Sequence, residues 1–177
     1  MEIKFRKLNI EEIDIKLFSN FIRRQVVKEC FRKVEDKWII KDDPFIDDWS
    51  DQDYAFLIEC LKNTINTGGV VFGAFCDNIL KGFSSVESKI FGEKYKYLDL
   101  TSIHVSEDMR GLGIGKELFN ISAGWARMMG GEKLYISSHS AVETQAFYKK
   151  MGCVEAIEYN KEHIEKEPFD CQLEFVL

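Results

Sequence analysis

Hydrophobic and polar residues alternate with a period of two at the start of the chain. This alternation predicts a first strand over residues 3–8. The spacing of apolar residues then becomes helical. Asn9 and Glu12 form a capping box in front of them, which predicts a helix over residues 9–22. A second helix with one apolar stripe is predicted over residues 50–67, where a glycine pair ends it.

The rest of the chain alternates strand patterns with two further helical patterns. Strands are predicted over residues 70–76, 79–87, 95–105, 133–138, 153–159 and 170–177, and helices over residues 113–129 and 142–151. The order is therefore β-α-α-β-β-β-α-β-α-β-β, which indicates a mixed α/β (α+β) fold around a central mixed, largely antiparallel sheet. With 177 residues and no linker or repeat, the chain is expected to form one domain over residues 1–177.

Composition narrows the classes of partner. The net charge of −6 argues against nucleic acid as a partner, because binding to a phosphate backbone requires a basic surface. No apolar run approaches the roughly 20 residues of a membrane span, and the first residues do not resemble a secretory signal. We therefore expect no membrane partner and a cytoplasmic location. The five cysteines show neither disulfide nor metal-ligand spacing, so reduced thiols and no metal site are expected.

The most informative segment is a glycine-rich turn between a predicted strand and a predicted helix, over residues 105–116. Its three glycines let the backbone approach an anion without obstruction by a Cβ atom. The first turn of the helix adds N–H groups without partners and the positive end of the helix dipole. Arg110 and Lys116 can add charge-assisted contacts. This pattern predicts a pyrophosphate-binding site.

Two common nucleotide-binding loops do not match this segment. A dinucleotide-binding turn has the spacing Gly-x-Gly-x-x-Gly, whereas here the glycines alternate as Gly-x-Gly-x-Gly. A nucleotide P-loop ends in Gly-Lys-Ser/Thr, whereas here Lys116 is followed by Glu117. A plain glycine-rich connection without a ligand stays open as the alternative.

Two motifs resemble one known family. Arg110-x-x-Gly113-x-Gly115 resembles the Q/R-x-x-G-x-G/A signature of the GCN5-related N-acetyltransferase (GNAT) superfamily. Phe147-Tyr148, followed by a glycine four residues later, resembles the end of the family's fourth helix. The similarity covers roughly residues 70–160 in detail and the whole chain in order of elements.

The resemblance implies the GNAT acyl-CoA N-acyltransferase fold, with acetyl-CoA as the cosubstrate. It implies a coenzyme site formed by Ile103, His104, Val105, Arg110, Gly111, Leu112, Gly113, Ile114, Gly115, Lys116, Ser140, Thr144, Phe147 and Tyr148. One position departs from the family pattern: Ala141 stands where many members carry an asparagine that contacts the coenzyme arm. Ser140 and Thr144 are the candidates to replace that contact.

The resemblance also implies catalytic roles. Tyr148 matches a tyrosine beside the coenzyme sulfur, which acts as a general acid or hydrogen-bond donor to the leaving thiolate. Backbone amides near residues 103–105 are expected to polarise the thioester carbonyl. Three side chains are candidates for the general base: Asp99, His104 and His139. A water chain without a single base is the fourth alternative.

The acceptor is expected to be a primary amine of a small molecule or a peptide. Acidic residues lie among four aromatic residues, Phe31, Trp38, Phe45 and Trp49, and this composition favours a cationic amine. The acidic residues are Asp42, Asp43, Asp47, Asp48, Asp51 and Asp53, and the last loop adds Glu162, Glu165 and Glu167. A solvated charged loop is the simpler interpretation of the same residues.

The sequence thus predicts an acetyl-CoA-dependent N-acetyltransferase that transfers the acetyl group directly in a ternary complex. No cysteine lies in a recognisable nucleophile motif, so a covalent acetyl-enzyme is not expected. The alternative is a non-catalytic acyl-CoA-binding or sensing module. Family members often form homodimers, and the C-terminal strands are candidates for such an interface.

Overall fold

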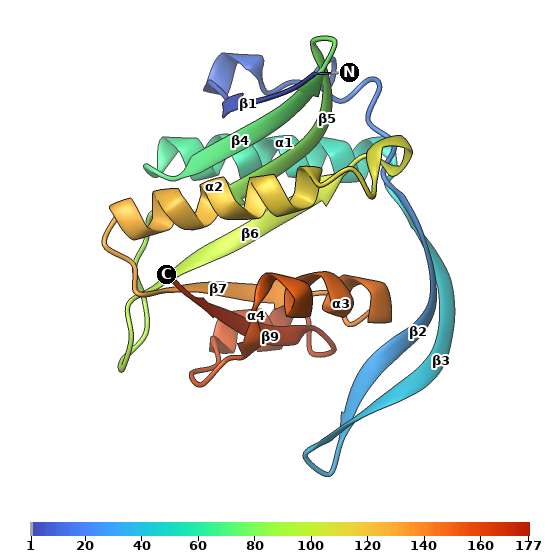
Figure 1. Ribbon diagram of the computed structural model, residues 1–177, viewed down its shortest axis with the longest axis vertical. Helices are drawn as coiled ribbons and strands as arrows, with labels where there is room; N and C mark the ends of the chain where they lie inside the picture. Colours follow the sequence, from blue (N-terminus) through green and yellow to red (C-terminus); the bar gives the residue numbers. More distant parts are fainter. Residues whose placement is uncertain (1) are drawn as a thin grey trace.

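The computed structural model describes residues 2–177. Its strands are β1 (Ile3–Lys7), β2 (Arg24–Val34), β3 (Lys37–Asp48), β4 (Val70–Cys76), β5 (Ile79–Val86), β6 (Tyr97–Val105), β7 (Lys133–Ser138), β8 (Val154–Glu155) and β9 (Cys171–Val176). Its helices are α1 (Asp51–Asn66), α2 (Ile114–Met128), α3 (Val142–Met151) and α4 (Lys161–Lys166). Seven strands form the central sheet in the order β1-β4-β5-β6-β7-β9-β8 (Figure 1). The sheet is mixed, because β6 and β7 are parallel and the other neighbours are antiparallel, so the predicted fold class is confirmed.

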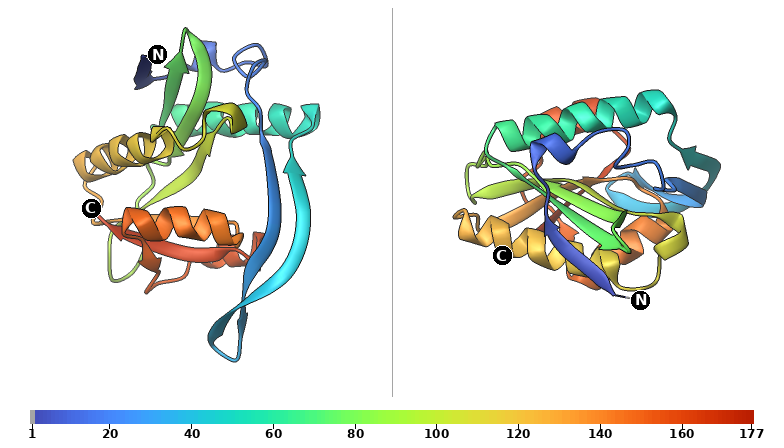
Figure 2. Two further views of the ribbon diagram at one scale, coloured as in Figure 1. Left: turned by 45° about the vertical axis from the view of Figure 1, so that its right-hand side comes forward. Right: turned by 90° about the horizontal axis from the view of Figure 1, so that it is seen from above.

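Helices cover both faces of the sheet. Seen from above in Figure 2, α1 lies on one side of the sheet and α2 on the other. The residues of β4 are all buried, and its side chains alternate between two hydrophobic clusters: Val70 and Phe72 pack in the cluster with α2, and Val71 and Phe75 in the cluster with α1. Each large apolar side chain buried in this way contributes roughly 1.5–3 kcal/mol to stability.

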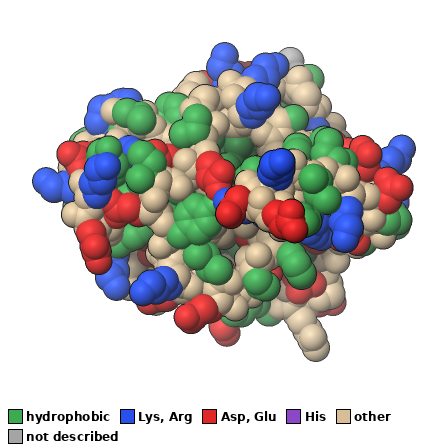
Figure 3. All heavy atoms as spheres, turned by 90° about the horizontal axis from the view of Figure 1, so that it is seen from below, with side chains coloured by type: hydrophobic (Ala, Val, Ile, Leu, Met, Phe, Trp, Pro, Cys, Tyr) green, Lys and Arg blue, Asp and Glu red, His purple; other side chains and the backbone are tan. Residues whose placement is uncertain are grey.

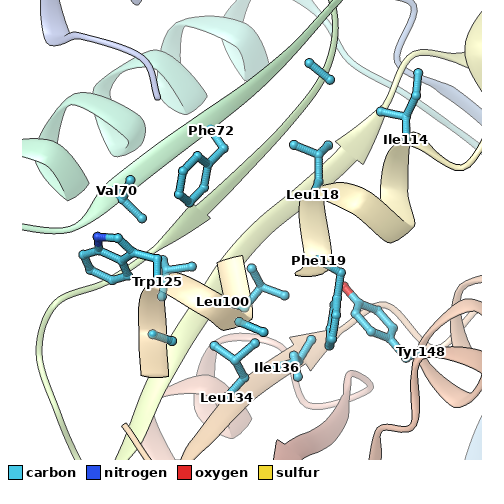
Figure 4. Close-up of a cluster of buried hydrophobic side chains, with 14 of the residues drawn as sticks. Val70, Phe72, Leu100, Ile114, Leu118, Phe119, Trp125, Leu134, Ile136 and Tyr148 are labelled. Atoms are coloured by element: carbon cyan, nitrogen blue, oxygen red, sulfur yellow. The ribbon is translucent and has the colours of Figure 1, made fainter. Parts of the chain in front are cut away.

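The cluster beside α2 extends from the sheet to α3. Figure 4 shows Phe119 of α2 between Ile136 of β7 and Tyr148 of α3, with Leu134 of β7 nearby, while Leu118 of α2 points away from them. All five side chains are at least 94% buried. The hydrophobic cluster therefore extends to Tyr148, the tyrosine predicted as a site residue.

The predicted β-hairpin of β4 and β5 is confirmed. Its two turn residues, Asp77 and Asn78, both have positive φ angles of 49° and 65°. Such angles give a two-residue turn whose twist matches that of the flanking strands, and Asp and Asn tolerate this conformation better than most residues.

The helix predicted over residues 9–22 is wrong. The capping box of Asn9 and Glu12 forms, but it opens only a 3₁₀ turn at Ile10–Glu12. At Ile13 the backbone leaves the helical region with φ −85° and ψ 89°. Ile13, Phe18 and Phe21 are buried against α1 and the sheet from a series of turns instead. The helical spacing correctly predicted the burial of these three residues but not of Ile22, which is 44% exposed, and turns stand in place of the predicted helix.

Residues 24–48, for which no strand was predicted, form a long antiparallel hairpin. Strands β2 and β3 pair from Arg24–Asp48 to Val34–Lys37, and Glu35 and Asp36 make the turn with positive φ angles. Figures 1 and 2 show this hairpin as an arm that runs along one side of the molecule, apart from the central sheet.

The base of this arm bridges the two strands that separate in the middle of the sheet. Strands β6 and β7 pair only from Tyr97–Lys133 to Asp99–Tyr135 and then diverge. Beyond β6, the backbone N–H of Glu107 donates to the carbonyl of Ile22 at 2.9 Å. Beyond β7, the N–H of Phe31 donates to the carbonyl of Ser140 at 2.8 Å. The segment from residue 22 to 31 therefore spans the open end of the gap between β6 and β7.

No helix among residues 2–177 combines the length and the apolar character needed to cross a lipid bilayer. The face of the molecule shown in Figure 3 carries acidic and basic side chains interspersed around a central group of hydrophobic ones, without a continuous basic surface.

Candidate active site

A cavity of about 870 Å³ lies where β6 and β7 separate. Its walls come from the base of the hairpin arm, the end of β6, the glycine-rich turn with the start of α2, and α3. Four basic side chains and one acidic side chain line it: Arg23, Arg110, Lys116, Lys150 and Glu143. A volume of this size suits a cofactor or a drug-sized ligand, and the excess of basic groups suits an anion.

The glycine-rich turn leaves the beginning of α2 free to bind an anion. Gly111 and Gly113 have φ angles of +80° and +83°, which glycine adopts without strain. A Cβ atom added at either position would meet no atom within 4 Å, so both face open space. Gly113 is the N-cap residue, and no side chain caps the helix. The first N–H groups of α2 thus lack intrahelical and side-chain partners and can bind a phosphate.

Gly115 has a second role in packing. An added Cβ would lie 3.3 Å from the Phe147 ring and 3.6 Å from the Val105 side chain. The glycine therefore lets α2, α3 and the end of β6 approach one another closely, and all three residues line the cavity.

The end of β6 offers backbone groups to the cavity. Ile103, His104 and Val105 pair with β5 on one side, and β7 has already diverged on the other. A register shift in the β5–β6 pairing near Thr101 marks a β-bulge directly before these residues. Backbone N–H groups of alternate residues point to opposite sides of a strand, so some on this stretch face the gap. These groups can polarise a carbonyl placed there.

Tyr148 is buried and lines the same cavity from α3. Burial raises the pKa of its hydroxyl well above the usual range, with smaller contributions from Cys153 and Asp170. The hydroxyl is thus protonated at neutral pH and can donate a hydrogen bond or a proton. Phe147 lies alongside, with ring centroids 5.2 Å apart.

The two candidates to replace the missing asparagine lie in different environments. Ala141 is fully buried and forms a β-bridge with Cys30 of the arm. Ser140 accepts a hydrogen bond from Arg32 Nη1 at 2.6 Å and is not among the residues that line the cavity. Thr144 does line it, and its hydroxyl oxygen accepts from the Gln25 amide at 3.3 Å. Leu112 is another predicted site residue outside the lining, with its side chain exposed.

The structure separates the three candidates for the general base. Asp99 lies outside the cavity, and its Oδ2 is 2.5 Å from His163 Nε2 on α4. His139 is also outside, where its Nδ1 accepts from the Ala141 N–H at 3.0 Å. His104 lines the cavity, but burial and then the charges of Arg23 and Arg110 lower its pKa to about 3. Its imidazole is therefore neutral and only weakly basic.

Sequence reasoning missed three cavity residues on the arm: Arg23, Gln25 and Val26. Arg23 is 9% exposed and forms an ion pair with Asp47 at 2.5 Å, while its buried Nε has no hydrogen-bond partner. Burial lowers the pKa of Arg23, and Asp47 opposes this shift. No local sequence pattern marks these three residues, because their place in the cavity depends on the arm, which was not predicted.

A second cavity, of about 570 Å³, lies between α1 and the β5–β6 face of the sheet. His104 lines both cavities, so they meet at this residue. Of the predicted acceptor aromatics only Trp49 lines it, while Trp38 binds Glu155 and Phe45 packs on His139. The structure thus distributes these aromatics along the arm instead of around one pocket.

No metal-binding cluster of three or more His, Cys, Asp or Glu side chains occurs within residues 2–177. In this described part of the chain, the glycine-rich turn, the open β6 edge and Tyr148 are the groups that the first cavity brings together.

Comparison with known proteins agrees with this geometry. The family described as "Acetyltransferase (GNAT) family" matches residues 26–153. No curated protein sequence matches the chain significantly. The match begins within β2 and includes the glycine-rich turn and α3.

Solved structures with the same fold include three whose chains align over nearly their whole length. A Bacillus anthracis str. Ames structure, assigned as a streptothricin acetyltransferase and in complex with acetyl coenzyme A, has a TM-score of 0.74 and 17% identity, covering 100% of this chain and 99% of that one. A nourseothricin acetyltransferase has a TM-score of 0.66 and 16% identity, with 98% and 96% covered. The PaiA N-acetyltransferase of Thermoplasma acidophilum, in complex with coenzyme A, has a TM-score of 0.62 and 18% identity, with 100% of both chains covered. At such low identity these likenesses show the fold.

Proposed function

Since this chain belongs to the acetyltransferase (GNAT) family, we propose that it transfers the acetyl group of acetyl-CoA directly to a primary amine in a ternary complex. The family makes the chain an acetyl-CoA-dependent acetyltransferase, an enzyme and not a sensing module. The single observation that carries the finer proposal is the first cavity. It unites an uncapped helix N-terminus, backbone groups at the diverging end of β6 and the Tyr148 hydroxyl.

The residues of the first cavity fit the coenzyme. The N–H groups of the first turn of α2, together with Lys116 and Lys150, would hold its phosphates. Thr144 and Gln25 would supply polar contacts to the amide-containing arm, in place of the asparagine replaced by Ala141. Gly111 and Gly113 leave the required space, because no atom lies within 4 Å of their added Cβ atoms.

The transfer forms one C–N bond and breaks one C–S bond. The uncharged amine nitrogen attacks the thioester carbonyl carbon, whose oxygen is stabilised by N–H groups of β6 near Ile103–Val105. The C–S bonding pair leaves with sulfur, and the Tyr148 hydroxyl donates a proton to the thiolate. The proton lost by the amine balances this transfer and returns through water to Tyr148.

Deprotonation of the amine does not require a strong enzymatic base. His104 is the one of the three predicted candidates that lines the cavity, but its low pKa makes it a poor store for a proton. We propose that His104 accepts a hydrogen bond that orients the incoming amine, and that water removes its proton. Asp99 is assigned to the support of α4 through His163.

The acceptor in this proposal is a primary amine of a small molecule or a peptide, with a preference for cationic compounds. The names of two fold neighbours, a streptothricin and a nourseothricin acetyltransferase, support small-molecule acceptors. We also propose a cytoplasmic location. It is supported by the five cysteines, which are all free thiols, four of them buried.

The test is release of free coenzyme A thiol from acetyl-CoA, measured with the purified protein and separate panels of polyamines, aminoglycosides, amino acids and peptides. We expect thiol release that depends on an amine and matches the amount of N-acetylated product. Binding of coenzyme A without turnover in any panel would contradict the proposed function. A burst of thiol release before any amine is added would contradict direct transfer.

A further inference from the structure

The second cavity runs lengthwise between α1 and the sheet. Residues of α1 from Asp53 to Thr64 line one wall, and residues of β5 and β6 line the other. Eleven positions separate Asp53 and Thr64, which corresponds to roughly 16 Å at the helical rise of about 1.5 Å per residue. The cavity is therefore an elongated slot.

The chemistry of this slot changes from one end to the other. At the end shared with the first cavity, the rings of Trp49 and His104 lie against each other with centroids 4.8 Å apart. At the far end Glu87 lies beside Thr64, and the backbone N–H of Glu87 donates to the carbonyl of Asp99 at 2.9 Å. Asp99 precedes His104 by five residues, which is on the order of 16 Å along an extended strand. The residues of α1 and those of β6 thus give the slot the same length, about 16 Å.

The charges that line the two cavities are opposite in sign. Three carboxylates line the second cavity, Asp53, Glu87 and Glu167, and none of its lining residues is a lysine or an arginine. His104 adds no charge, because its imidazole is neutral. Burial and the charges of Glu59 and Glu87 raise the pKa of the Cys60 thiol in the lining, and Lys166 opposes this shift. The first cavity, in contrast, is lined by four basic residues and one acidic residue.

Two of the three lining carboxylates, those of Glu87 and Asp53, accept hydrogen bonds from hydroxyl groups. Thr64 Oγ1 donates to Glu87 Oε1 at 2.5 Å, and Ser50 Oγ donates to Asp53 Oδ2 at 2.7 Å. Hydrogen bonds from Ser50 lower the pKa of Asp53. No salt bridge within residues 2–177 involves Asp53, Glu87 or Glu167. Their negative charge is therefore available to a ligand.

We propose that this slot binds the acceptor, and that the acceptor carries a second cationic group about 10–16 Å from the amine that is acetylated. This inference rests on the proposed function, which places the transfer where the two cavities meet. The reacting amine lies at Trp49 and His104, where the neutral imidazole accepts a hydrogen bond from it, and Asp53 in the first turn of α1 lies at this end as well. The distal ammonium lies at Glu87 and Glu167, where ion pairs and hydrogen bonds stabilise its charge.

Binding is tested without catalysis, on the protein saturated with coenzyme A. Calorimetric titrations compare 1,8-diaminooctane with octylamine, which has the same chain length but lacks the second charge. We expect the diamine to bind about tenfold more tightly or better, since a charge-assisted hydrogen bond contributes about 1.5–3 kcal/mol. We expect this preference to decrease with added salt.

Matched variants locate the distal cation. Glu87→Gln keeps an oxygen for the Thr64 hydroxyl, and Glu167→Gln changes an exposed side chain, so both are expected to fold. Each should weaken diamine binding about tenfold and reduce the preference for the diamine over octylamine. Glu162→Gln, on the same helix as His163 but outside the lining, is the control and should leave both affinities unchanged.

The two proposals fail in different ways. Acetyl transfer to amines with no preference for 1,8-diaminooctane over octylamine, in binding and in kcat/KM, would overturn the slot assignment and leave the acetyltransferase function intact. Selective diamine binding that depends on Glu87, without transfer to any amine, would support the slot and contradict the proposed function. Equal effects of Glu87→Gln and Glu162→Gln would overturn the slot assignment.

Discussion

The guanidinium of Arg110 donates a hydrogen bond from Nη2 to the backbone carbonyl of Arg24 at 2.7 Å. Its Nε donates to the carbonyl of Val105 at 3.3 Å. The arginine of the glycine-rich turn thus connects that turn to the end of β6 and to the hairpin arm. Arg110 therefore holds three walls of the first cavity together.

Removal of these hydrogen bonds should loosen the cavity. We expect Arg110→Met to weaken coenzyme A binding by about tenfold and to lower the free energy of unfolding by about 1–2 kcal/mol, since two hydrogen bonds are lost. Calorimetry and urea denaturation measure the two effects. Arg24→Ala is the control, because it keeps the accepting carbonyl and loses only a 3.4 Å contact with Glu107. If both variants bound coenzyme A equally well, the connecting role of Arg110 would be wrong.

A carboxylate in the glycine-rich turn should block the anion site. We expect Gly113→Glu to weaken coenzyme A binding at least about 100-fold, because its charge repels the pyrophosphate and its φ of +83° disfavours any side chain. Gly113→Ala carries the same backbone strain without the charge, so it should cost about 1 kcal/mol of stability and much less affinity. Equal affinities of the two variants would show that the charge of the site plays no part.

Loss of the Tyr148 hydroxyl should slow the chemical step. We expect Tyr148→Phe to lower kcat by about 100-fold, the range typical of a general acid, with the coenzyme A affinity changed by less than about twofold. Single-turnover rates and calorimetry separate the two quantities. Tyr159→Phe removes an exposed hydroxyl outside both cavities and should leave kcat unchanged. Full turnover by Tyr148→Phe at every pH would rule out its role as the acid.

The pH dependence should follow the amine and not a histidine. Burial and two guanidinium groups lower the pKa of His104 to about 3, so it stays neutral throughout the accessible pH range. We therefore expect kcat/KM to rise with pH toward the pKa of the amine substrate, without an inflection near pH 6.5. His104→Asn should lower kcat/KM without changing the shape of this profile. An inflection near pH 6.5 that disappears in His104→Asn would instead identify His104 as a general base.

The His163–Asp99 pair should make stability depend on pH. Its hydrogen bond with Asp99 raises the pKa of His163, against the opposing effect of burial. The folded state therefore binds a proton more tightly than the unfolded state. The resulting stability is fully present below about pH 6.5 and is lost as pH rises through the folded-state pKa. Urea denaturation at pH 5.5 and pH 9 should show a decrease of about 1 kcal/mol that is absent in His163→Gln. The same pH dependence in His163→Gln would contradict this assignment.

Local patterns were sufficient for several elements. The Asp77-Asn78 turn, the glycine-rich turn into α2 and the Phe147-Tyr148 pair on α3 were all predicted, and the structure forms each element. In each case the signal is contained in a few consecutive residues, because turn conformation and helix periodicity are determined by near neighbours.

The hairpin arm depended on contacts that no local pattern shows. Val26 pairs with Ile46, and both side chains are about half exposed, so burial leaves no clear alternation in the sequence. Pro44 lies in β3 next to the register irregularity, where a strand with one free edge tolerates proline. Pairing with β2, 20 residues earlier in the Val26–Ile46 register, is what makes this segment a strand.

Tertiary structure alone also decided which candidate residues share a site. Asp99 and His163 are 64 residues apart in sequence but in direct contact. Asp99 therefore does not line the first cavity. The sequence determined the glycine-rich turn into α2, because glycine spacing and a helix start are local properties. It did not determine the second cavity, whose walls come from α1, the sheet and the segment after α4. Glu87, Glu167 and His104 lie far apart in the sequence. They line one cavity only because the distant segments that carry them pack together in the folded chain.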